Sequence, residues 1–415
     1  MNLLYLVHRL PYPPNKGDKV RSYHLLKHLA ARHRVFLGSF VDDPDDAQHI
    51  DTVRALCADL HVAPLQPRRA KLRSLGGLLS GAPLTLGYYR DAGLQHWVAR
   101  TAAREQLDAA VVFSSSMAPY AESVAGLPTL VDFVDVDSAK WTQYASAHRW
   151  PMSAVYRREG KRLLACERAI AARAVRSFFV TEAECALFAA LAPECAGRVE
   201  PLGNGVDAEH FAPAAARPSP FAPGELPIVF TGAMDYWPNV DAVSWFAQDV
   251  LPRLRADWPQ LRFHIVGRAP TAAVRALACA SVVVSGTVPD VRPYLQHAAV
   301  AVAPLRVARG IQNKVLEAMA MGCAVVAAQS CADVIGAVPG SELMAAGDGA
   351  DFARQIDALL REPARASAIG AAGRQCVLRG FSWPAQLGRI DLHLAALPAS
   401  ASAAAPCTPL LEAAT

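Results

Sequence analysis

Residues 309–322, which read RGIQNKVLEAMAMG, decide the fold of this chain. Apolar runs at 300–304 and 324–328 flank the stretch and are typical of buried strands, while 312–321 has a helical pattern. A glycine such as Gly310 before a helix lets backbone N–H groups approach an anionic ligand, which the helix dipole also favours. Lys314 in the first turn opposes that dipole, so an anionic ligand would explain it. Glu317 shares a helix face with Lys314, and a solvated ion pair is the plain alternative.

The same alternation of strand and helix patterns extends over the whole chain, and it indicates βαβ units with parallel sheets. Helical patterns cover 18–31, 152–174 and 382–397. The expected strands form two series, 3–7, 34–40, 109–113, 129–133 and 177–180, and then 227–232, 262–267, 282–285, 300–304 and 324–328. The Ala- and Pro-rich residues 212–227 separate the two series. We therefore expect an α/β protein with two Rossmann-like, doubly wound domains that bind ligands at the carboxyl ends of their strands.

The composition excludes several classes of protein. The 415 residues are 53% hydrophobic and 19% charged, and the net charge is only +4, which fits a globular protein and not a nucleic-acid binder. The nine cysteines are scattered, which argues against a disulfide framework or a structural zinc site. The first apolar run is too short for a signal sequence, and no run is long enough to span a membrane. We expect a cytoplasmic protein whose membrane contact, if any, is peripheral.

The segment 310–326 resembles the donor-binding motif of the retaining glycosyltransferase family 4 clan, and further matches are NGVD at 204–207, Thr231-Gly232 and Val266-Gly267. Residues 13–21 and 135–141 are similar to the PEP-CTERM-associated sugar transferases of exopolysaccharide loci. The resemblance spans about residues 1–395. It implies the GT-B fold, in which an acceptor domain (1–205) and a nucleotide-sugar donor domain (206–380) face each other across a cleft, then a crossover helix (381–397) and a disordered tail (398–415).

The resemblance also implies a function. The chain would transfer a hexosyl group from a nucleoside diphosphate sugar to a saccharide or lipid-linked acceptor in surface polysaccharide biosynthesis. Front-side attack, with the leaving diphosphate taking the acceptor's proton, would need neither a strong protein base nor a metal cofactor. Glu317 would hold the donor ribose and Lys314 the diphosphate. The other expected donor-binding residues are Gly17, Gly232, Arg268, Gly310 and Asn313. Arg268 has a plain alternative as a surface arginine.

The loop before the first helix carries Lys16, Lys19 and Arg21 around Gly17. Cations at a helix N-terminus are unfavourable, and a phosphate or acidic acceptor group would reverse that effect. A solvated turn is the alternative.

The basic, leucine-containing segment 68–79 includes Arg68, Arg69, Lys71 and Arg73. It fits either contact with an anionic bilayer or an exposed helix.

The sequence departs from the clan at two places. The clan commonly has two glutamates eight positions apart, but Arg309 stands where the first is expected. A guanidinium pairs well with a carboxylate, so Arg309 would suit a uronic-acid donor, unless it turns to the diphosphate or to solvent. The clan also commonly has His-Asp at a strand end, where this chain has Val134-Asp135. We expect Lys314, Asp135 and Arg309 to be catalytic, and the histidine's role is open among Asp132, Asp137 and His8.

Three alternatives remain open from the sequence. Asp135 and Asp137 spell the DxD pattern that binds Mn²⁺ or Mg²⁺ in single-domain GT-A enzymes, although we expect no metal site here. A nucleotide-sugar epimerase of the same architecture would turn over the donor without an acceptor. A catalytically silent sugar-nucleotide-binding partner would bind the donor without turnover.

Overall fold

The computed structural model describes residues 1–14, 16–307 and 311–397 and divides them into two compact units. The N-terminal unit comprises Met1–Gly203 together with the described residues from Leu387 onward, and the C-terminal unit comprises Asn204–Gln386. Helix α19 (Trp383–Ala395) therefore begins in the C-terminal unit and ends in the N-terminal one. The tail at 398–415, which the sequence predicts to be disordered, lies outside the described residues.

The N-terminal unit is built on a seven-stranded parallel sheet in the order β3-β2-β1-β4-β5-β6-β7. Its inner strand β1 is fully buried from Leu3 to Val7, as expected for a strand covered on both faces. The strands are β1 (Asn2–Val7), β2 (Arg34–Val41), β3 (Asp59–Pro64), β4 (Ala109–Phe113), β5 (Thr129–Val134), β6 (Arg176–Phe179) and β7 (Val199–Pro201).

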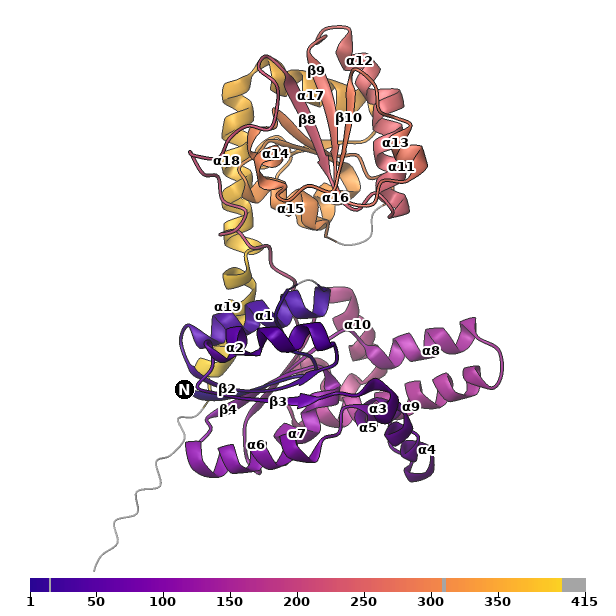
Figure 1. The fold of residues 1–415 in the computed structure, drawn as a ribbon, viewed down its shortest axis with the longest axis vertical. Coiled ribbons are helices and arrows are strands. Elements are labelled where there is room, and N and C mark those ends of the chain that lie inside the picture. Colours follow the sequence, from indigo (N-terminus) through magenta and orange to yellow (C-terminus); the bar gives the residue numbers. More distant parts are fainter. Residues whose placement is uncertain (15, 308–310, 398–415) are drawn as a thin grey trace, which may run out of the picture. The chain divides into compact units, whose positions relative to one another are not determined.

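Helices cover both faces of this sheet, with α1 and α2 on one face and α6 and α7 on the other (Figure 1). The long pair α8 and α9 projects from the unit, and its helices pack against each other. The α-helices are α1 (Gly17–Ala30), α2 (Ile50–Arg54), α3 (Pro67–Ser74), α4 (Gly76–Ser80), α5 (Leu84–Tyr88), α6 (Ala92–Glu105), α7 (Ala118–Glu122), α8 (Asp137–Ala147), α9 (Met152–Arg173) and α10 (Glu182–Leu191). Short 3-10 helices are η1 (Pro44–His49), η2 (Ser115–Met117) and η3 (Pro193–Arg198).

The C-terminal unit is built on a six-stranded parallel sheet in the order β10-β9-β8-β11-β12-β13. The strands are β8 (Leu226–Thr231), β9 (Leu261–Val266), β10 (Val282–Gly286), β11 (Val300–Ala303), β12 (Val325–Ala328) and β13 (Met344–Ala346). The helices are α11 (Trp237–Trp245), the π-helix η4 (Phe246–Val250), α12 (Leu251–Arg255), α13 (Ala272–Arg275), α14 (Arg292–His297), α15 (Asn313–Ala320), α16 (Gln329–Ile335), α17 (Gly349–Arg361) and α18 (Pro363–Gly380).

The expected fold class, two doubly wound α/β units, is confirmed. In the N-terminal sheet β2 and β3 are added on one side of β1, and the strands from β4 onward are added on its other side. The C-terminal sheet reverses in the same way between β8 and β11. Open α/β sheets bind ligands at the carboxyl ends of the strands beside such a reversal. We therefore expect ligand-binding residues at the carboxyl ends of β1 and β4 and of β8 and β11. None of the described helices is both long and apolar enough to cross a bilayer.

Candidate functional site

The loops that follow β8, β9 and β10, together with the start of α15, enclose a cavity of about 710 Å³ in the C-terminal unit. It lies at the carboxyl edge of the sheet, beside the reversal between β8 and β11. The lining residues that matter below come from the loops after β8 and β9 and from helices α11 and α15, namely Gly232, Asn239, Gly267, Arg268, Asn313, Lys314 and Glu317.

Two glycines allow these loops to approach each other closely. A Cβ atom on Gly267 would lie 1.6 Å from the Gly232 carbonyl oxygen, so no larger residue fits there without moving the backbone. A Cβ atom on Gly232 would lie 2.8 Å from the Asn239 Nδ2 and 3.1 Å from the Lys314 Nζ. The absence of side chains at both positions therefore leaves room for the Lys314 ammonium group at the cavity wall.

Two contacts hold the Lys314 side chain in place. It lies in the first turn of α15, and its Nζ donates a hydrogen bond to the Asn239 Oδ1 at 2.5 Å. The same ammonium group is 4.2 Å from the centroid of the Phe230 ring, within range of a cation–π interaction. Asn239 is buried and is itself fixed, because its Nδ2 donates to the Ala233 carbonyl at 2.8 Å. Burial lowers the pKa of Lys314 to about 8, although the charge of Glu317 opposes this shift.

Glu317 lies one helical turn after Lys314 and lines the same cavity. Burial raises the pKa of its carboxyl group, and the charge of Lys314 partly offsets that effect. Within the described ranges no hydrogen bond to the Glu317 carboxylate is found, whereas the Lys314 ammonium has Asn239. The cavity thus presents a hydrogen-bond acceptor at Glu317 and a cation at Lys314, both from the first two turns of α15.

Five of the expected donor-binding residues line this one cavity, namely Gly232, Arg268, Asn313, Lys314 and Glu317. Arg268 is exposed two residues after the end of β9. The predictions for Arg309 and Gly310 fall on residues outside the described ranges. Sequence reasoning assigned no role to Asn239. Its position in the first turn of α11, facing a lysine 75 residues away, is not visible in a local pattern.

In the N-terminal unit, Gly17 is the exposed first residue of α1. Our interpretation of Lys19 and Arg21 as cations that await an anionic ligand is wrong. Both side chains are buried in salt bridges, Lys19 with Asp46 at 2.6 Å and Arg21 with Asp132 at 2.7 and 2.9 Å. Buried charges must be paired, and these pairs tie α1 to η1 and to β5.

Asp135 and Asp137 share a single cation of the protein itself. The Lys140 Nζ lies 2.7 Å from the Asp135 Oδ2 and 3.0 Å from the Asp137 Oδ1. The DxD alternative requires these carboxylate oxygens to bind a metal ion. In the structure the Lys140 ammonium group contacts both carboxylates instead. No cluster of three or more His, Cys, Asp or Glu side chains suited to a metal occurs in the part of the chain that the structure describes.

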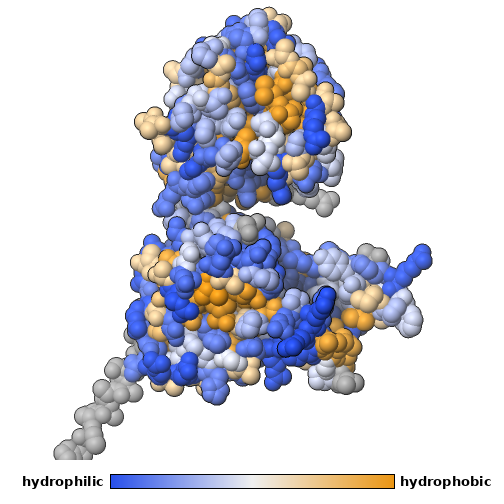
Figure 2. Space-filling model, in the orientation of Figure 1, coloured by the Kyte–Doolittle hydropathy of each residue, from blue (hydrophilic) through white to orange (hydrophobic). Residues whose placement is uncertain are grey.

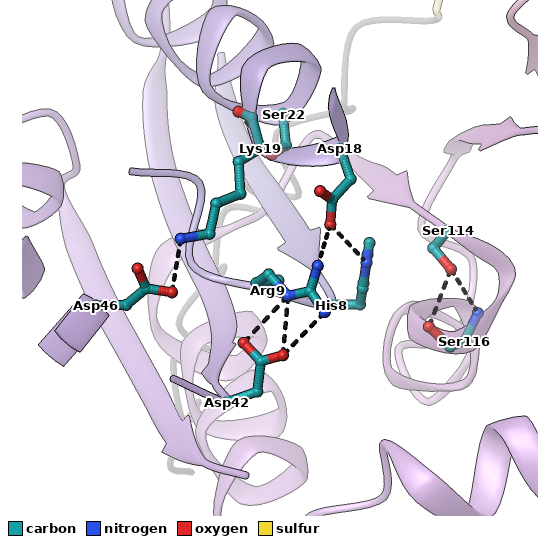
Figure 3. A network of polar contacts seen from close by, with 9 residues as sticks. All are labelled: His8, Arg9, Asp18, Lys19, Ser22, Asp42, Asp46, Ser114 and Ser116. Carbon is teal, nitrogen blue, oxygen red and sulfur yellow. Dashed lines mark hydrogen bonds and ion pairs between the residues drawn. The ribbon is translucent and has the colours of Figure 1, made fainter. Parts of the chain in front are cut away.

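His8 follows β1, beside the reversal in the N-terminal sheet, and its ring stacks on Phe113 at 5.8 Å. Its Nε2 lies 3.5 Å from the Asp18 Oδ2, and Arg9 bridges Asp18 at 2.6 Å and Asp42 at 2.9 Å (Figure 3). Burial opposes ionisation of Asp18, but the contacts with His8 and Arg9 outweigh it and hold the pKa of this carboxyl group below its ordinary value. Of the three candidates for the missing histidine's role, Asp132 is thus committed to Arg21, Asp137 to Lys140 and His8 to Asp18.

Comparisons with known proteins agree with this arrangement. Residues 225–362 match the family model described as Glycosyl transferases group 1. The structure of HepE from Anabaena in complex with UDP is similar, with a TM-score of 0.60 and 16% identity over 96% of this chain and 100% of that one. Sucrose-phosphate synthase from Thermosynechococcus elongatus has a TM-score of 0.58 and 20% identity over 96% and 100%. A glycosyltransferase from Rickettsia africae has a TM-score of 0.59 and 12% identity over 94% and 97%. No curated protein matches the sequence.

The two parallel sheets with their helices are those of the GT-B fold. The match to the Glycosyl transferases group 1 model falls within the C-terminal unit, and it includes Lys314 and Glu317 of the cavity described above.

Proposed function

We propose that this protein is a retaining glycosyltransferase that moves a hexosyl group from a nucleoside diphosphate sugar to a lipid-linked saccharide acceptor in surface polysaccharide assembly. The observation that carries the proposal is the single cavity that joins Lys314 and Glu317. The Glycosyl transferases group 1 match over these residues supports it. HepE, one of the similar structures, was crystallised with UDP and with UDP-glucose, so a UDP-sugar is the first donor to test.

The two side chains suit different parts of such a donor. The Glu317 carboxylate, an acceptor without a donor among the described residues, would accept hydrogen bonds from the ribose hydroxyls. The Lys314 ammonium would meet the diphosphate, where the start of α15 adds backbone N–H groups and a favourable dipole. Arg268, exposed at the end of β9, is placed to contribute a further cation from the same cavity wall.

Catalysis on this proposal is mainly electrostatic. As the bond from the sugar to the diphosphate breaks, negative charge grows on the leaving oxygen, and a cation fixed in advance stabilises that charge without reorganising. Lys314 meets this condition because Asn239 and the Phe230 ring hold it before any ligand arrives. The diphosphate itself accepts the acceptor's proton, so the proposal requires no metal ion and no strong protein base.

The proposal places the enzyme in the cytoplasm at the inner face of the membrane, in contact through α3 and α4. Arg68, Arg69 and Lys71 are exposed there, and Leu72 and Leu75 expose 70% and 51% of their surface. Cations beside exposed leucines favour an anionic bilayer. Arg73, the fourth predicted cation, donates to the Gly87 and Tyr88 carbonyls and is therefore partly committed within the protein.

Thermal unfolding with UDP-, GDP-, ADP- and TDP-sugars tests the proposal first. A ligand at a hundred times its dissociation constant stabilises the protein by about 2.7 kcal/mol, so the matching donor raises the melting temperature clearly. Incubation of that donor with lipid-linked acceptors then tests transfer. Donor turnover that yields only an epimeric nucleotide sugar would point to an epimerase, and binding with neither transfer nor hydrolysis would point to a silent partner.

A further inference from the structure

A second cavity of about 490 Å³ lies in the N-terminal unit, between the α3–α5 segment on one side and η2, α7 and the start of α6 on the other. We call it the α4–α7 pocket. It is lined by Arg73, Gly76, Gly77, Ser80, Ala82, Pro83, Leu86, Gly87, Tyr89, Arg90, Gln95, Ser116, Pro119 and Tyr120. All of these residues belong to the N-terminal unit, so the pocket is separate from the cavity of Lys314.

The lining of the α4–α7 pocket combines apolar side chains with positively charged ones. Pro83, Leu86 and Pro119 give it hydrocarbon walls, and its two charged residues are Arg73 and Arg90, with no carboxylate. The Arg73 guanidinium is oriented by the Gly87 and Tyr88 carbonyls at 3.1 and 2.8 Å. For Arg90 no ion pair is found within the described ranges. Such a lining favours a ligand that is both apolar and negatively charged.

Two lining residues of the pocket, Ser116 and Tyr89, lie close to the reversal in the N-terminal sheet. Ser116 lies in η2, directly after β4, and its Oγ is 3.1 Å from the Ser114 Oγ. Tyr89, another lining residue, packs its ring edge-on against His8 at 5.6 Å. Figure 3 shows Ser114 and Ser116 in the same close view as His8 and Asp18. A ligand in the pocket would therefore extend towards the edge where open α/β sheets bind their substrates.

Exposed leucines neighbour the pocket-lining residues of α4. Gly76, Gly77 and Ser80 of α4 line the pocket, while Leu75 and Leu78 next to them expose 51% and 43% of their surface. Figure 2 shows hydrophobic residues gathered over the α4 region among strongly hydrophilic ones. Exposed leucines beside a cationic helix are typical of a surface that touches lipid.

We propose that the α4–α7 pocket binds an amphipathic anion, a single long apolar chain with a phosphate head, and that this is the lipid carrier of the acceptor. The proposal rests on the transferase function above and adds where the acceptor's lipid is held. The apolar chain lies along Pro83, Leu86 and Pro119 and leaves past α4 at the membrane side. The phosphate meets Arg90 and Arg73, so the linked saccharide points towards Ser116 and His8.

Calorimetric titration of the full-length protein with farnesyl phosphate tests this assignment. Farnesol, which has only the apolar chain, and inorganic phosphate, which has only the charged head, are the control ligands. Farnesyl phosphate should bind at least about ten-fold more tightly than either part, because only it uses both the walls and the arginines. Arg90→Gln should weaken farnesyl phosphate about ten-fold, and Leu86→Ala should weaken farnesyl phosphate but not inorganic phosphate. Arg54→Gln, which removes an exposed arginine elsewhere in the same unit, is the matched control and should change nothing.

Equal affinity of Arg90→Gln and wild type for farnesyl phosphate would overturn the proposal. Equal affinity of wild type for inorganic and farnesyl phosphate would also overturn it, because the site would then hold a free anion. Binding of UDP, measured on the same samples, distinguishes failure of the lipid-pocket assignment from failure of the donor-site assignment. If UDP binds and farnesyl phosphate does not, the pocket assignment fails alone, whereas loss of UDP binding concerns the donor site.

Discussion

The Lys314 ammonium group donates a hydrogen bond to the Asn239 side-chain carbonyl, across 75 residues of sequence, and both residues line one cavity of the C-terminal unit. Asn239 is fixed in turn by its bond to the Ala233 carbonyl. A lysine side chain is flexible when free, and ordering it at the moment of reaction would cost conformational entropy. Asn239 removes most of that cost in advance, which is what a group that stabilises a transition state requires.

Replacement of Lys314 by alanine should therefore lower turnover more than donor affinity. Charge on the leaving diphosphate is larger in the transition state than in the bound donor, so the lost stabilisation appears mainly in kcat. Initial rates at varied donor concentration measure both parameters. Arg268→Gln is the matched control, since it removes an exposed cation from the same cavity and should have the smaller effect on kcat. A loss confined to KM would mean that Lys314 only binds the donor.

The affinity for a nucleoside diphosphate should fall as the pH rises through about 8. Burial lowers the pKa of Lys314 from its ordinary value to about 8, so its ammonium form is present below that pH and is lost above it. Only the ammonium form attracts the diphosphate, which gives the decrease its sign. UDP titrations between pH 6.5 and 9.5 measure it. In Asn239→Leu the ammonium loses its acceptor, so the decrease should begin at lower pH, and a flat profile in wild type would contradict the assignment.

The buried pair of Arg21 and Asp132 should contribute to folding and not to ligand binding. Asp132→Asn removes one charge from a pair that is 1% exposed on both sides, and breaking such a pair typically costs about 3–5 kcal/mol. The melting temperature should fall well below that of Asp51→Asn, whose carboxylate is fully exposed on α2. A variant that melts normally but no longer binds acceptor would restore the ligand role that the sequence suggested for Arg21.

Cosedimentation with anionic vesicles should decrease as salt rises, because the attraction of Arg68, Arg69 and Lys71 to the bilayer is screened within a Debye length. Neutralising these three residues should abolish most of the binding at low salt. Neutral vesicles provide the control for contacts of the exposed leucines alone. Equal sedimentation of the neutralised variant and wild type would exclude this surface.

The sequence predicted the central strands and missed strands at the sheet edges. Strands such as β1 and β4 are covered on both faces and therefore appear as continuous apolar runs. Strands β3, β7 and β13 lie at the edges of their sheets, and β7 and β13 have only three residues each. Short or half-polar segments of this kind owe their pairing to the neighbouring strand, which a local pattern does not reveal.

The candidate site was predicted where its residues are close in sequence. Lys314 and Glu317 lie three positions apart on one helix, so their common face could be derived from the helical repeat. The roles of Lys19 and Arg21 could not, because their carboxylate partners lie 27 and 111 positions away. A cation at a helix N-terminus has the same sequence whether it awaits a ligand or is already paired, and only the tertiary structure distinguishes the two cases.

The most direct test of the donor site is calorimetric titration of UDP into wild type and Glu317→Gln. The substitution keeps the shape of the side chain and removes the charge that would hold the ribose hydroxyls, a charge-assisted hydrogen bond of about 1.5–3 kcal/mol. We expect wild type to bind UDP and the correctly folded variant to bind it about 10- to 150-fold more weakly. Unchanged affinity for UDP in Glu317→Gln would contradict the assignment of this cavity as the nucleotide-sugar site.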